Sequence, residues 1–106
     1  MDRIAQLESF LEEDPDDPFT QFALAQEHLK QDDIDVAQQY FEGLVEEHPD
    51  YVGTYYHLGK LYERLGQTDT AIDTYEQGIE IARTQHDQKN LSELQDALMK
   101  AKGIGF

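Results

Sequence analysis

The sequence contains no cysteine and no tryptophan, and only eight lysines and arginines stand against 23 aspartates and glutamates. Without cysteine there can be no disulfide framework, no thiol nucleophile and no cysteine-ligated zinc. The net charge of −15 would repel a phosphate backbone or an anionic membrane surface. We therefore expect neither nucleic acid nor a membrane among the partners of this chain.

Long apolar runs are also missing. No stretch approaches the roughly 20 apolar residues that cross a bilayer, and residues 1–10 lack the basic start and the apolar run of a signal peptide. We therefore expect a protein of the cytoplasm.

The motifs that carry catalysis or bind metals are absent too. No glycine-rich phosphate loop occurs, and Ser9 and Ser92 have no neighbouring histidine. His28 and Asp32 are four residues apart, but no second histidine joins them, and residues 32–35 lack the glycine and glutamate of a calcium loop. We expect a protein that is not an enzyme and that uses no metal and no cofactor.

What the sequence does contain is a repeat of 34 residues. A shift of 34 positions aligns Leu24 with Leu58 and Ala37 with Ala71. Self-similarity at such a period is typical of repeat architectures, in which each unit packs on its neighbours. Further identical pairs are Thr20 with Thr54, Asp35 with Asp69, Glu42 with Glu76, and Glu46 with Glu80.

Each repeat unit has the pattern of two helices. In the better-formed unit a stripe at i, i+3, i+4 and i+7 runs from Tyr55 to Tyr62 and ends before Gly66, a residue typical of helix C-termini. A second helix is expected to start near Thr68 or Asp69, which can both cap a helix. No alternating, strand-like run competes with these patterns, so the predicted fold is all-α.

We expect one domain over residues 1–106, since a chain of this length buries roughly 60 to 68% of its unfolded surface. The last helix is expected to start with Asn90 or Ser92 as its cap. The expected parts are a half repeat at 3–16, a first repeat at 17–50, a second repeat at 51–85 and a C-terminal capping helix at 88–102.

The second unit reads Y-x2-L-G-x2-Y from Tyr55 and then A-x3-Y from Ala71. This is similar to the tetratricopeptide repeat pattern W-x2-L-G-x2-Y…A-x3-F…P, with an aromatic residue in place of the tryptophan and without the final proline. The resemblance implies a short right-handed superhelix of antiparallel helix pairs. Small residues such as Ala37 and Ala71 predict close helix crossings, because helices approach closely only where side chains are small.

The resemblance also implies an interaction module, in which the first helix of each unit lines a concave surface that holds a partner segment. Three of the eight cations fall on the predicted groove faces beside aromatic residues, which would suit a peptide with apolar side chains and a carboxylate. The same cations would also complement the helix dipoles without any partner. The candidate residues, opposite Leu24 and Leu58 on their helices, are Phe19, Phe22, Ala23, Gln26, Lys30, Tyr56, His57, Lys60 and Arg64.

Two functions remain open from the sequence. The first is a module that binds a protein or peptide partner in the groove. The alternative is a self-assembling structural unit, a homodimer formed through the open surfaces of the half repeat or the cap, without a peptide ligand. A sizing column run at several concentrations would separate the two.

Overall fold

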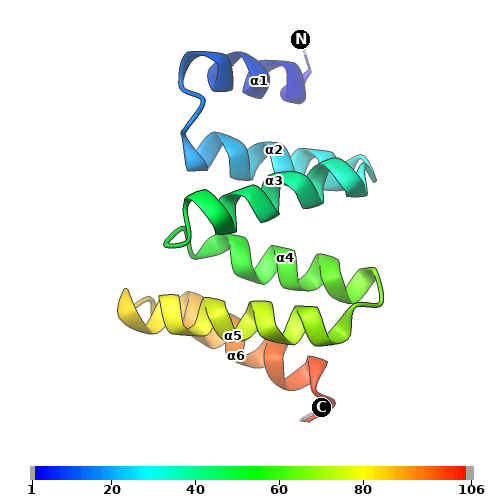
Figure 1. Ribbon diagram of the computed structural model, residues 1–106, viewed down its shortest axis with the longest axis vertical. Coiled ribbons are helices and arrows are strands. Elements are labelled where there is room, and N and C mark those ends of the chain that lie inside the picture. The colour runs from blue at the N-terminus through cyan, green and yellow to red at the C-terminus, as the bar shows by residue number, and fades with distance from the viewer. Residues whose placement is uncertain (1, 105–106) are drawn as a thin grey trace. The chain divides into compact units, whose positions relative to one another are not determined.

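The computed structural model describes residues 2–104. Within this range the chain forms six α-helices and no strand (Figure 1). The expectation of an all-α fold is therefore confirmed. The helices are α1 (Arg3–Glu13), α2 (Pro18–Lys30), α3 (Ile34–Glu47), α4 (Gly53–Arg64), α5 (Thr68–Thr84) and α6 (Gln88–Ala101).

The helices divide into two compact units. Unit 1, Met1–Tyr51, holds α1, α2 and α3, and unit 2, Val52–Phe106, holds α4, α5 and α6. No helix among the described residues has the length and apolar character that crossing a membrane requires.

In unit 1, α2 and α3 form an antiparallel pair, and α1 packs on α2. The close pairing of α2 and α3 follows from their small residues, since Ala25 and Ala37 have no exposed surface. Phe41 and Leu44 of α3 fill the space beside them and are also fully buried. Leu7 of α1 is 2% exposed and joins the same interior through Leu24.

In unit 2, α4 and α5 form the equivalent pair, and α6 packs on both. A Cβ atom added at Gly59 of α4 would overlap the ring of Tyr75 on α5. The Tyr75 hydroxyl donates a hydrogen bond of 2.5 Å to Oε2 of Glu63. Burial and this bond raise the pKa of Tyr75. Ala71 has no exposed surface, so both alanines that were predicted at helix crossings are buried.

The turn inside each pair has the same backbone geometry. Gly66 follows α4 with a φ of +78°, and Asp32 occupies the equivalent position after α2 with a φ of +64°. In both turns the next amide N–H returns to the helix: Asp33 donates to the carbonyl of His28, and Gln67 donates to that of Tyr62, each at 2.8 Å. This is the Schellman ending, which places a left-handed residue directly after the helix.

The expected cap of the last helix was wrong. Helix α6 begins at Gln88, and its cap is Asp87, whose Oδ1 accepts the backbone N–H of Asn90 at 3.1 Å. Asn90 is thus a capped residue, not the cap. The apolar stripe of α6 begins only at Leu91, and it does not show which of the preceding polar residues is the cap.

Candidate functional site

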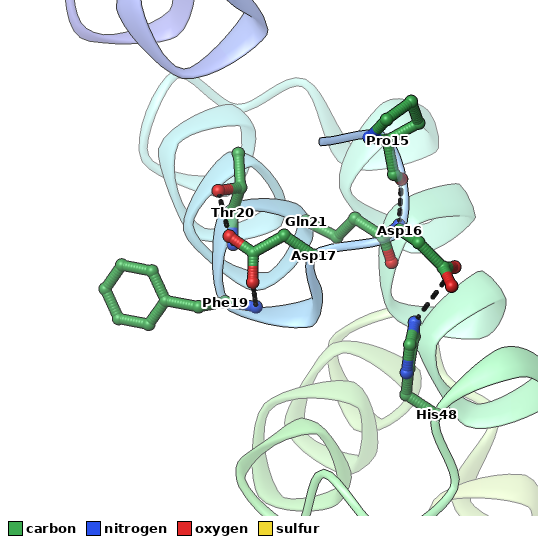
Figure 2. Close-up of polar contacts among 7 residues, drawn as sticks. All are labelled: Pro15, Asp16, Asp17, Phe19, Thr20, Gln21 and His48. Carbon is green, nitrogen blue, oxygen red and sulfur yellow. Dashed lines mark hydrogen bonds and ion pairs between the residues drawn. The ribbon is translucent and has the colours of Figure 1, made fainter. Parts of the chain in front are cut away.

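The exposed end of α2 is fixed by Asp17. Its carboxylate accepts hydrogen bonds from the N–H of Phe19 at 3.2 Å and from the hydroxyl of Thr20 at 2.6 Å. The bond from the Thr20 hydroxyl is the largest cause that lowers the pKa of Asp17. Pro18 suits the first helical position because it has no N–H to leave unpaired. The ring of Phe19 then projects away from the helices (Figure 2) and is 63% exposed.

The loop before α2 is held on both sides. The side-chain amide of Gln21 donates to the carbonyl of Pro15 at 2.8 Å, and Asp16 lies 3.4 Å from Nε2 of His48, the residue that follows α3 (Figure 2). The start of α2 is therefore tied to the end of α3 within unit 1.

The other predicted residues of α2 divide into inner and outer positions. The Phe22 ring lies 5.5 Å from that of Tyr51, and Ala23 is buried in a cluster with Leu7 and Leu24. These two side chains thus pack within unit 1. Gln26 is half-buried, and Lys30 is exposed with Nζ 3.5 Å from Oε1 of Glu27.

On α4 the structure brings three of the predicted residues together. Nζ of Lys60 lies 5.5 Å from the centre of the Tyr56 ring, within range of a cation–π interaction. The ring of His57 meets Tyr56 edge to face, also at 5.5 Å. Arg64 follows one turn after Lys60, and both cations are exposed. This face offers an aromatic surface beside two positive charges.

Helix α6 adds charges to this face, although it was expected only as a C-terminal capping helix. Burial lowers the pKa of His57, and the charge of Glu93 on α6 partly opposes that shift. A hydrogen bond to Asp96 at 3.0 Å raises the pKa of Lys100, to which Tyr56 also contributes. The sequence did contain a sign that α6 has the pattern of a first helix: Leu91, Leu94 and Leu98 have the same spacing as Tyr55, Leu58 and Tyr62.

The net charge is divided unequally between the units. Residues 1–51 hold 15 acidic side chains and two basic ones, a net charge of −13. Residues 52–106 hold eight acidic and six basic side chains, a net charge of −2. Almost all of the negative charge therefore belongs to unit 1, and most of the cations belong to unit 2. Among residues 2–104, no group of three histidine, aspartate or glutamate side chains could hold a metal ion.

Comparison with known protein families identifies the family of this chain. A tetratricopeptide repeat model matches residues 22–86, which is more than half of the chain. The chain belongs to the tetratricopeptide repeat (TPR) family. A search of curated proteins found no match.

Solved structures agree with this assignment. The crystal structure of a TPR domain protein from Salinibacter ruber is 70% identical, with a TM-score of 0.80 over 82% of this chain and 98% of that one. A solution structure of a TPR domain protein from the same organism is also 70% identical, with a TM-score of 0.81 over 85% and 91% of the two chains. A Bordetella parapertussis protein is 24% identical, with a TM-score of 0.81 over 96% of this chain and 89% of that one, and this likeness shows the fold alone.

Proposed function

We propose that this TPR chain binds a segment of a partner protein through the outward faces of its first helices, α2 and α4. TPR domains are in general protein-interaction modules, and fold alone does not name the partner. We further propose that the chain acts in the cytoplasm, without catalytic activity, and that its partners are proteins and not nucleic acids or membranes.

The observation that carries this proposal is the face of α4. Lys60 lies over the Tyr56 ring, and Arg64 is exposed one turn further on. A carboxylate of the partner would pair with these cations, and an apolar side chain would cover the ring. On α2 the exposed ring of Phe19, with Gln26 and Lys30, provides a second set of contacts of the same kind. Phe22 and Ala23, the other predicted residues of α2, pack within unit 1, beside Tyr51 and in the cluster with Leu7.

Charge reversal tests the α4 face. A partner would first be captured from native cytosol by the wild-type chain, and its affinity would then be measured by calorimetry with purified components. We expect the double variant Lys60→Glu/Arg64→Glu to weaken binding by about tenfold or more, because attraction to a carboxylate becomes repulsion.

The matched control reverses two cations elsewhere in unit 2. Arg83 pairs with Glu80 on α5, and Lys102 pairs with Glu76. The variant Arg83→Glu/Lys102→Glu also replaces two cations by two carboxylates, so it changes the net charge by the same amount. If both double variants weaken binding to the same extent, the α4 face is not the site. Circular dichroism should show an unchanged helix content for both.

Self-assembly stands as a second candidate function because of one exposed aromatic ring. Phe10 of α1 is 54% exposed, whereas Leu44, its counterpart one repeat later, is fully buried in α3. An apolar ring left open at this position would suit a second copy of the chain. Sizing chromatography over a range of concentrations tests this, and Phe10→Asp should then shift a dimer towards the monomer.

A further inference from the structure

A hollow in unit 1 shares no residue with the faces of α2 and α4 described above. Its walls come from Glu8, Leu11 and Glu12 of α1, Pro15 of the following loop and Tyr40 of α3. Glu8 and Glu12 are one helical turn apart, which places both carboxylates on the same side of α1. Leu11 and Tyr40 are partly buried against the cluster of Leu7, Ala23 and Leu24. The hollow thus combines an apolar floor with two carboxylates.

The Tyr40 ring is held in place by a neighbour. It stacks on His28 with 5.9 Å between the ring centres and 17° between the ring planes. Burial raises the pKa of Tyr40, and the charge of Glu8 contributes to that shift, so the carboxylate acts on the phenol across the hollow. Within residues 2–104, Glu8 and Glu12 make no ion pair and no hydrogen bond through their side chains.

The surrounding charge is of one sign. No lysine or arginine occurs between residues 4 and 29, while seven aspartates and glutamates do. Unit 1 as a whole carries a net charge of −13. A second copy of this chain complements this surface less well than a basic segment does, since its unit 1 has the same charge and its unit 2 holds eight acidic side chains beside six basic ones. The charge that fits the hollow is therefore that of a basic partner.

We propose that unit 1 carries a second interaction surface, which binds a basic segment of a partner protein by accepting an arginine or lysine side chain into the hollow between α1 and α3. The cationic head pairs with Glu8 and Glu12 and lies against the Tyr40 ring. The methylene stem contacts Leu11 and Pro15, as long cationic side chains commonly do on apolar surface. Arginine fits best, because its planar guanidinium both binds carboxylates and stacks on aromatic rings.

Two labelled peptides test the proposal with the full chain. One consists of repeated Arg-Leu-Gly triplets, and the other replaces each arginine by citrulline, which has the same shape without the charge. We expect fluorescence anisotropy at low ionic strength to show binding of the arginine peptide, and binding at least about tenfold weaker for the citrulline peptide. Equal binding of the two peptides would overturn the proposal.

A pair of double variants separates a site from general attraction by charge. Glu8→Gln/Glu12→Gln removes both carboxylates of the hollow, and we expect about tenfold weaker binding of the arginine peptide. Glu13→Gln/Glu46→Gln removes two exposed carboxylates of unit 1 outside the hollow and changes the net charge equally. We expect this control to weaken binding about twofold at most. An equal loss for both variants would refute the site.

Binding of the arginine peptide to the hollow does not depend on the proposed binding of a partner through α4. The variant Lys60→Glu/Arg64→Glu alters only the α4 face in unit 2, and it should bind the arginine peptide at least as tightly as the wild type does. A loss of peptide binding in that variant would contradict the assignment to unit 1.

Discussion

At the residue scale, Gly66 and Gly43 occupy opposite backbone environments. Gly66 has a φ of +78° after α4, whereas Gly43 lies within α3, and a Cβ atom added at either would meet no atom within 4 Å. The same substitution should therefore change stability in opposite directions. Gly66→Ala should lower the free energy of unfolding by about 1 kcal/mol, because a Cβ is strained in the left-handed region. Gly43→Ala should raise it by about 0.5 to 1 kcal/mol through helix propensity. Urea titrations of both variants check this, and equal signs would contradict it.

His86 lets the same argument be tested in reverse. It is exposed and has a φ of +56° after α5, in the position that Gly66 occupies after α4. His86→Gly should raise the free energy of unfolding by up to about 1 kcal/mol, because glycine adopts this conformation without a steric penalty. The measurement is again urea denaturation. A destabilised variant would mean that the imidazole makes interactions worth more than the relieved strain.

At the scale of helices, close crossings depend on residues without side chains. A Cβ at Gly78 of α5 would come 2.5 Å from Cβ of Tyr55, an atom that cannot rotate away. Gly78→Ala should therefore cost roughly 1 to 3 kcal/mol by overpacking, despite its better helix propensity. Gly43→Ala is the matched control, since it is the same change in a helix with free space around the added methyl group. A thermal midpoint for Gly78→Ala at or above that of the wild type would show that the helices shift apart at little cost.

The start of α2 should be sensitive to acid through Asp17. The folded pKa of this carboxyl is lowered from its ordinary 3.8, so its contribution to stability is present above that pH and is lost as the pH falls through the folded value. Asp17→Ala should cost about 1 kcal/mol at pH 7, and the difference from the wild type should shrink below pH 4. Asp17→Asn keeps an oxygen acceptor and should cost less at pH 7. A difference that does not change with pH would mean that the charge of the cap is irrelevant.

The pattern of helices was predictable because a 34-residue shift superimposes both pairs, and the stripe from Tyr55 to Tyr62 marks a buried face. The close approach of α4 to α5 at Gly78 was not predictable, because the equivalent residue in the first repeat is Leu44, a large side chain that is fully buried. The inward packing of Ala23 depends on which side of α2 meets α1, and a single helix pattern does not specify this.

The surroundings of the predicted binding face on α4 were foreseen only in part, for a physical reason at the end of α5. This helix has 17 residues against 14 in α3, so the apolar stripe of α6 no longer obeys the shift of 34. The contribution of Glu93 and Lys100 to the surroundings of the α4 face was therefore missed. The exposed positions of Lys60 and Arg64 agree with helical periodicity, which is a local property of the sequence.

At the scale of the whole molecule, the excess of negative charge should make stability depend on salt. Fifteen uncompensated charges repel one another more in a folded chain than in an expanded one. The Debye length falls from about 8 Å at 0.15 M salt to about 3 Å at 1 M, so this repulsion should largely disappear over that range. Each kcal/mol of relieved repulsion should raise the thermal midpoint by about 4 to 8 °C in a chain of this size. Sodium chloride is the appropriate salt, because sulfate would also strengthen apolar burial.

Because the charge is divided unevenly, the effect of salt on stability should differ between the two units. Unit 1 has a net charge of −13 and unit 2 has −2, so screening should stabilise unit 1 more. Hydrogen exchange of the buried amides of Phe41 and Leu44 reports on unit 1, and that of Tyr75 and Ile79 reports on unit 2. We expect protection of the first pair to increase more steeply with sodium chloride. An equal increase in both units would mean that salt acts on apolar burial in general. A thermal midpoint that stays constant or falls with sodium chloride would mean that the carboxylates of unit 1 are spaced widely enough for their repulsion to be small.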